Sequence, residues 1–103
     1  MDIKQLRYFV AIVEEGSFSS ASKRVRIAQP ALSLQVRKME EALQTKLLLR
    51  GPQGIIPTEA GEFLAVSARK ILKDLAQTTD DLRSMGREPL GTVRIGLPGT
   101  ISS

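Results

Sequence analysis

The stretch that decides the fold runs from Ser17 to Leu43 and reads SFSSASKRVRIAQPALSLQVRKMEEAL. Ser17 follows a helix-ending Gly16 and stands at an N-cap position, where its hydroxyl can accept a bond from a first-turn N–H. The short helix that it starts has an apolar inner face made of Phe18, Ala21 and Val25. Pro30 fits just inside a further helix, because its missing N–H costs nothing there. That helix carries an inner stripe of Leu32, Val36, Met39 and Leu43. Two helices joined by a tight connection at about residues 26–29 predict a helix-turn-helix over about 18–37.

The segments on either side complete a small domain. Upstream, apolar residues at helical spacing predict a first helix whose inner face holds Leu6, Phe9, Val10 and Val13. Downstream, the apolar runs 47–50 and 55–56 flank the turn cluster 51–54, which predicts a two-stranded hairpin. The sequence therefore predicts a mainly α fold, in which three helices and a two-stranded wing form a winged helix-turn-helix over residues 1–58.

A long helix is expected next, capped by Thr58 and free of proline through residue 87. At 1.5 Å per residue it would be about 43 Å long. A 3-4-3-4 spacing predicts a dimerisation seam made of Leu64, Ala68, Ile71, Leu75, Thr78, Leu82 and Met85. Phe63 and Val66 lie off this seam and are expected to pack back on the small domain. The alternative is an ordinary amphipathic helix folded on its own core.

The last segment changes character again. Residues 88–91 should break the helix, and residues 92–97 alternate like a β-strand. Because one strand is not stable alone, we expect either the first strand of an absent domain or a tail that pairs with another chain. The predicted division is thus a winged domain at 1–58, a linker and dimerisation helix at 59–88, and a hinge with a first strand at 89–103.

Composition excludes several classes of function. The 103 residues include no His, Cys or Trp, which rules out a Ser-His-Asp triad, a thiol nucleophile and the usual zinc sites. The paired acids Glu40–Glu41 and Asp80–Asp81 do not face each other on helices, and we interpret them as solvated. No apolar run is long enough to span a membrane. We expect a cytoplasmic protein that is not an enzyme and that takes no metal or cofactor.

The positive charge is concentrated in the winged domain. Residues 1–58 carry nine Lys and Arg against five Asp and Glu, whereas residues 59–103 carry six of each. Five of the basic residues fall within 23–38, where there is no acid. Such a block favours a polyanion partner, and its alternative is a solvated helix face without a partner.

The outward positions of the third helix match the chemistry of the DNA major groove. Gln pairs with adenine, Arg with guanine, and apolar groups contact the thymine methyl. The predicted base contacts are Gln29, Pro30, Ser33, Leu34 and Arg37. The predicted phosphate contacts are Lys23, Arg24, Arg26, Lys38 and Arg50. A protein–protein adaptor that uses the long helix remains the alternative, and affinity for DNA that falls steeply with salt would separate the two.

Several short motifs together resemble the LysR-type transcriptional regulators. They are Leu6–Phe9, Ser17–Phe18, Ala21, Ala28–Ser33, Leu47–Arg50, Pro57–Gly61 and Gly91–Gly96. The closing residues 95–100 look similar to nitrogen-assimilation-type members of that family. Two positions depart from the pattern: Ala28 replaces a capping Ser or Thr, and Leu34 replaces a polar or basic residue.

The resemblance implies a DNA-binding transcriptional regulator that forms a homodimer through an antiparallel pair of linker helices. Its sites would be short inverted repeats rich in A/T. It further implies that full-length members carry an effector domain after the segment seen here, so this stretch should bind no small-molecule effector.

Overall fold

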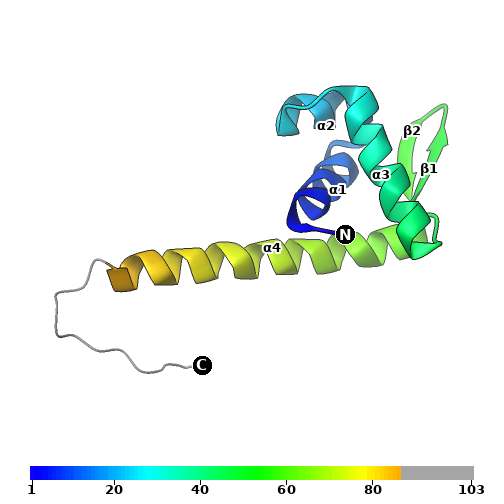
Figure 1. Cartoon of the computed structure of the whole chain (residues 1–103). Coiled ribbons are helices and arrows are strands. Elements are labelled where there is room, and N and C mark those ends of the chain that lie inside the picture. Colours follow the sequence, from blue (N-terminus) through cyan, green and yellow to red (C-terminus); the bar gives the residue numbers. More distant parts are fainter. Residues whose placement is uncertain (87–103) are drawn as a thin grey trace. The chain divides into compact units, whose positions relative to one another are not determined.

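The computed structural model describes residues 1–86, which fall into two units, Met1–Lys73 and the residues from Asp74 onward. The elements in chain order are α1 (Ile3–Glu15), α2 (Phe18–Val25), α3 (Gln29–Leu43), β1 (Leu48–Gly51), β2 (Gly54–Pro57) and α4 (Glu59–Gly86) (Figure 1). The mainly α fold with three helices, a wing and a long helix is confirmed. The strand expected at 92–97 lies outside the described residues.

Helix starts follow the capping chemistry of the sequence. The Ser17 hydroxyl accepts a hydrogen bond from the Ser20 N–H at 3.1 Å, which confirms Ser17 as the N-cap of α2. Asp2 caps α1 in a reciprocal box with Gln5, a feature that the spacing Asp-x-x-Gln encodes. Pro30 lies in the first turn of α3 as predicted, and Ala28, at the N-cap, provides no side-chain hydrogen bond.

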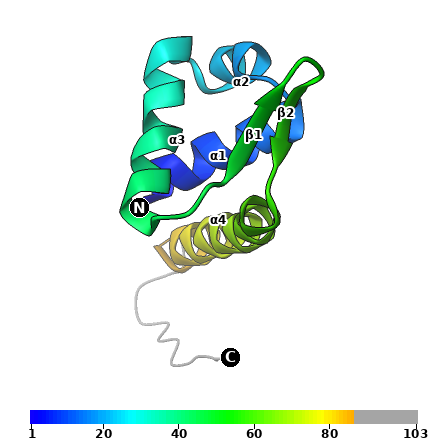
Figure 2. The same cartoon turned by 90° about the vertical axis from the view of Figure 1, so that its right-hand side faces the viewer.

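The wing is an antiparallel hairpin in which Leu48 pairs with Pro57 and Arg50 with Ile55 (Figure 2). The half of the hairpin next to its turn is attached to the end of α1, because the Ile55 N–H donates to the Gly16 carbonyl at 3.3 Å. Gly16 is itself in the left-handed region with φ 76°, a conformation that favours glycine. The end of α1 and the direction of the wing are therefore set at one point.

The core of the first unit lies among α1, α2, α3, the start of the wing and the first turns of α4. The predicted inner residues Leu32, Val36 and Met39 are buried, but Leu43 is 42% exposed, so its place in the stripe was wrong. Leu43 is the last residue of α3, where the chain already turns toward the wing. Ala11 and Ile12 are fully buried in addition to the predicted stripe of α1, since α1 packs against α2, α3 and β2.

Residues Thr58 and Gly61 dock the start of α4 on the root of the wing. The Thr58 hydroxyl donates to the Lys46 carbonyl at 2.7 Å and accepts from the Gly61 N–H at 3.0 Å, which confirms Thr58 as the cap. A Cβ atom on Gly61 would lie 2.0 Å from the Leu47 carbonyl oxygen. Glycine is thus required here by close backbone approach and not by backbone conformation.

The residues of the first turns of α4 that pack on the core are not the ones predicted to do so. Leu64, Ala65 and Ala68 are buried in the core of the same chain, whereas Phe63 is 74% and Val66 is 65% exposed. The expectation that Phe63 and Val66 pack back on the domain was therefore wrong. At 100° per residue the buried positions form one face, and Phe63 and Val66 fall on the opposite side.

In the second unit, the described part of α4 is almost entirely accessible. Leu75, Leu82 and Met85 are 38%, 62% and 48% exposed. Among the described residues, no helix combines the length and the apolar character that crossing a membrane requires.

Candidate nucleic-acid interface

The outward face of α3 carries the five residues predicted to contact bases. Gln29, Pro30 and Arg37 are exposed, Leu34 is 42% exposed, and Ser33 is half-buried. The Ala28 N-cap leaves the first turn of this helix without a side-chain partner. A polar helix face with an open N-terminus suits an anionic surface, because the helix dipole is positive at that end.

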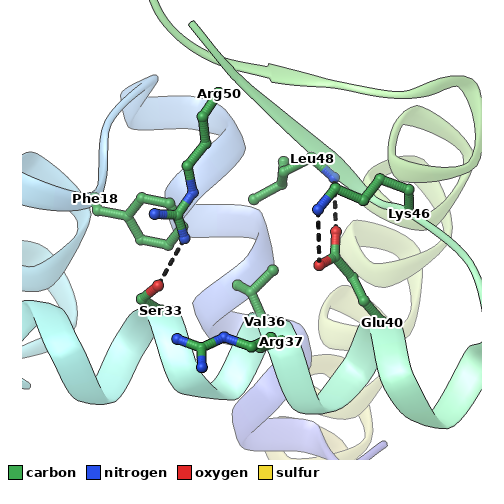
Figure 3. A pocket seen from close by; sticks show the side chains of 8 residues that line it. All are labelled: Phe18, Ser33, Val36, Arg37, Glu40, Lys46, Leu48 and Arg50. Atoms are coloured by element: carbon green, nitrogen blue, oxygen red, sulfur yellow. Dashed lines mark hydrogen bonds and ion pairs between the residues drawn. The ribbon is translucent and has the colours of Figure 1, made fainter.

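Arg50 reaches from the wing to this helix and contacts two residues at once. Its Nη2 donates to the Ser33 hydroxyl at 2.6 Å, and its guanidinium carbon lies 4.5 Å from the centre of the Phe18 ring (Figure 3). A predicted phosphate contact and a predicted base contact are thereby joined by a hydrogen bond. We call Arg50, Ser33 and Phe18 the Arg50 corner.

The Arg50 corner forms one wall of a pocket of about 240 Å³ between α3 and β1. The charged residues around it are Arg37, Arg50, Lys46 and Glu40. Three positive groups against one carboxylate give this pocket a positive potential, which favours phosphate or the acceptor edges of bases. The structure thus brings Ser33, Arg37 and Arg50 to one place.

Glu40 has a structural role that the sequence interpretation missed. Its Oε2 accepts hydrogen bonds from the backbone N–H groups of Leu47 and Leu48 at 2.8 and 3.2 Å, and Lys46 pairs with Oε1 at 3.8 Å. The side chain is only 14% exposed, so the interpretation of Glu40 as a solvated acid was wrong. Glu40 ties the beginning of the wing to α3.

Arg24 is in a different environment from Arg50. Its Nη1 pairs with Glu14 at 2.8 Å and with Glu15 at 3.3 Å, and Glu14 also pairs with Arg69 of α4 at 2.9 Å. We call Glu14, Glu15, Arg24 and Arg69 the Glu14 cluster. Hydrogen bonds from Arg69 and Arg24 hold the pKa of Glu14 below its usual value, and the bond to Glu14 raises the pKa of Arg24.

The remaining predicted phosphate contacts are spread over three places. Lys23 is exposed in the last turn of α2, and Arg26 is the C-cap of α2 with a left-handed φ of 62°. Lys38 is exposed on α3 directly after Arg37, and consecutive helix positions point in different directions. The structure therefore does not gather these three residues around the pocket.

Helical spacing could have grouped Glu40 with two of the predicted contacts on α3. Ser33, Arg37 and Glu40 stand at i, i+4 and i+7, which places them along one side of α3. Lys46 lies two residues before the first wing strand, outside α3. Which side of α3 meets the wing depends on tertiary packing, and no pattern within the helix reveals it.

The predicted dimer contacts divide by burial. Leu64 and Ala68 belong to the core of their own chain, so they are not open to a second copy. Ile71 in the first unit is 44% exposed. The seam residues of the second unit are exposed throughout, namely Leu75, Thr78, Leu82 and Met85.

Known proteins are similar in sequence to this chain over its whole length. Residues 3–62 match the family model described as bacterial regulatory helix-turn-helix protein, lysR family. The nitrogen assimilation regulatory proteins nac of Klebsiella aerogenes and of Escherichia coli K12 are 43% and 42% identical over 104 residues. These alignments cover 100% of the chain but 34% of each relative, so the chain spans about a third of their length. The likeness to nitrogen-assimilation-type members is confirmed.

Solved structures agree with the fold. The BenM_DBD/catB site 1 DNA complex is 38% identical with a TM-score of 0.84, covering 86% of this chain and 100% of that one. The CbnR_DBD–DNA complex is 36% identical with a TM-score of 0.78, covering 84% and 100%. Both contain a DNA-binding domain held on DNA. The match of more than half of the chain to the family model, with these structures, shows that the chain belongs to the LysR family of bacterial regulatory helix-turn-helix proteins.

Proposed function

We propose that the chain is a sequence-specific DNA-binding module of a transcriptional regulator. The observation that carries the proposal is the outward face of α3, where Ser33 and Arg37 share one positive pocket with Arg50 of the wing. A helix with this face fits the major groove, and the wing can then reach the flanking backbone. Such a role needs no bond-making chemistry, and it places the protein in the cytoplasm with bacterial DNA.

In this proposal the exposed residues of α3 read the bases. They are Gln29, Pro30, Ser33, Leu34 and Arg37. The phosphate contacts are Lys23, Arg26, Lys38 and Arg50, with Lys46 added because it lines the same pocket as Arg37. Arg24 contributes least, since carboxylates of the Glu14 cluster already neutralise its charge.

The test is a gel shift with a duplex pool at two salt concentrations, followed by selection of the bound sequences. Release of counterions from each neutralised phosphate makes affinity fall steeply with salt. We expect steep salt dependence and enrichment of a short inverted repeat. Affinity that does not depend on salt would contradict DNA binding and favour the adaptor role.

We further propose that two copies associate through exposed apolar positions of α4. Ile71 supplies such a position in the first unit, and Leu75, Leu82 and Met85 supply them in the second. Exposed apolar residues along a helix favour burial against a partner helix. Two copies would present two recognition helices to an inverted repeat, whose half-site spacing reflects the symmetry of the dimer.

Light scattering of Leu75→Asp tests the dimer. We expect a monomer with much weaker affinity for the selected repeat, because a charge replaces an apolar contact. Ala76→Asp is the matched control, since Ala76 is exposed on the same helix and lies outside the seam. A dimer of unchanged mass in Leu75→Asp would remove Leu75 from the interface.

The domain division stays part of the proposal. We propose that residues 1–58 carry the DNA contacts, that residues 59–88 serve as linker, and that residues 89–103 lead into a further domain. The family model over residues 3–62 supports a first boundary close to residue 58, and the greater length of the nac proteins, of which 34% is aligned, supports the last part.

A further inference from the structure

In the Arg50 corner, the residues predicted to contact DNA also hold one another in a fixed arrangement. The 2.6 Å hydrogen bond from Arg50 uses one acceptor site of the Ser33 hydroxyl. On the other side, the Phe18 ring lies under the guanidinium and is itself only 9% exposed. A guanidinium held between a hydroxyl and a ring has a defined orientation before any ligand arrives.

The backbone that carries Arg50 is also held in place. Two residues upstream, the Leu48 N–H donates to Glu40 of α3. Across the hairpin, Arg50 pairs with Ile55, whose N–H donates to the Gly16 carbonyl. Contacts on two sides thus fix β1 relative to α3, and the hydrogen bond between Arg50 and Ser33 does not depend on a free loop.

This arrangement restricts what Ser33 can do. A serine hydroxyl has one hydrogen to donate and two acceptor sites, whereas a guanidinium only donates. With Arg50 donating to its oxygen, the hydroxyl hydrogen points away from the guanidinium. The neighbouring positive charge also opposes the approach of a second donor to that oxygen. The Ser33 hydroxyl is left as a donor toward the outside.

We propose that Arg50 is a positioning residue for base recognition, because it converts Ser33 from a group of either polarity into a hydrogen-bond donor. This inference rests on the proposed function. As a donor, Ser33 selects base edges that offer an acceptor, which are N7 and O6 of guanine, N7 of adenine and O4 of thymine. It rejects the N4 amino group of cytosine and the N6 amino group of adenine.

The alternative is that Arg50 only contacts phosphate and has no influence on what Ser33 recognises. In that role its charge would strengthen binding to every duplex alike, and its loss would lower the salt dependence. Positioning instead predicts an effect on one base position that depends on Ser33. The two roles therefore differ in specificity and in coupling, even where both lower affinity.

The experiment starts with selection from a pool of randomised duplexes by the whole chain and by Ser33→Ala. The position at which Ser33→Ala loses its preference is the one that Ser33 reads. Affinities of Arg50→Met, Arg50→Lys and the double variant are then measured on duplexes that differ at that position. Arg50→Met keeps an apolar stem on Phe18 but cannot donate. Arg7→Met, on the exposed side of α1, is the matched control for the lost charge.

We expect Ser33→Ala and Arg50→Met each to reduce discrimination at the same position by about fivefold, the factor that one hydrogen bond of ordinary strength supplies. The double variant should lose no more than either single variant. Arg50→Lys should recover the salt dependence without recovering the preference, because a point charge lacks the planar fork and the ring contact. Unchanged melting temperatures exclude a folding defect.

Three results would overturn the inference. They are a uniform loss of affinity in Arg50→Met with the preference intact, additive losses in the double variant, and full recovery of the preference by Arg50→Lys. Failure of the proposed function gives a different result, because the unaltered chain would then enrich no sequence and bind the pool without salt dependence.

Discussion

The Arg50 corner and the Glu14 cluster each hold an arginine that the sequence assigns to DNA phosphates. Arg50 meets a hydroxyl and an aromatic ring, which leave its charge uncompensated. Arg24 meets two carboxylates, which compensate its charge and tie it to α1. A basic residue is therefore available to a polyanion when no acid from another element pairs with it, as for Arg50, and is less available when one does, as for Arg24. The charge count of residues 23–38 contains no such information.

The largest effect is expected from Gly61→Ala, which disturbs both regions together. The added Cβ would lie 2.0 Å from the Leu47 carbonyl, so α4 must move away from the root of the wing. Arg69 moves with α4, and the wing carries Arg50. We expect a loss of about 3 kcal/mol in the free energy of unfolding, as for severe overpacking. Urea denaturation measures it, and Gly86→Ala, where nothing is within 4 Å of the added atom, is the control.

Arg37→Ala should lower the affinity for DNA without changing the stability of the fold. If Arg37 makes a bidentate base contact, its removal costs about 1–3 kcal/mol of binding free energy and relaxes specificity at one position. The exposed side chain contributes little to the core, so stability should hold. Titration of selected and random duplexes checks this, and equal loss of affinity for both would assign Arg37 to phosphate.

Glu14→Gln should make the two regions more alike. Removing the carboxylate releases Arg69 and leaves Arg24, which follows directly on Lys23, paired with Glu15 alone. We expect the free energy of unfolding to fall by about 1 kcal/mol, because exposed ion pairs contribute little each. We also expect affinity for random duplexes to rise, with a salt slope steeper by about one unit. An unchanged salt slope in Glu14→Gln and in the double variant Glu14→Gln with Glu15→Gln would show that Arg24 is out of reach of DNA.

The smallest expected effect is a pH dependence of the free energy of unfolding that arises from Glu14. The pKa of Glu14 is lowered in the folded chain by its bonds to Arg69 and Arg24, so the unfolded chain binds its proton more readily. The stabilisation is present above the ordinary carboxyl pKa and is lost as the pH falls through the lowered value. Acid unfolding of the unaltered chain and of Glu14→Gln should therefore converge at low pH and differ near neutrality. A constant difference at every pH would exclude this linkage.

Much of the fold could be predicted because its signals are local. The Ser17 cap, Pro30 in the first turn and the turn cluster of the wing each act within a few residues. The errors arose where another element decides the outcome. Leu43 continues the apolar stripe of α3 but lies beyond the core, and Phe63 is apolar but faces away from it.

The candidate site also combines features that local patterns predict with features that only packing between elements decides. The outward residues of α3 follow from knowing its inner face, so Leu34 and Arg37 were placed correctly on the exposed side. The contacts of Arg50 with Ser33 and of Arg24 with Glu14 join residues 17 and 10 positions apart, and they depend on how the helices and the wing pack. Charge and spacing identify candidates, whereas packing decides which of them are neutralised.

The attachment of the wing at Gly16 has a consequence for how this scaffold can vary. The strand end beside the turn cannot change easily, since Gly54 has φ 112° and an added Cβ would lie 3.2 Å from the Gly16 carbonyl oxygen. The tip residues Pro52 and Gln53 are exposed. Exposed loop tips are the preferred places for insertions. Insertions at the tip can therefore lengthen the wing beyond Gly54 without disturbing its attachment to Gly16, so that the reach of the wing is adjustable independently of α3.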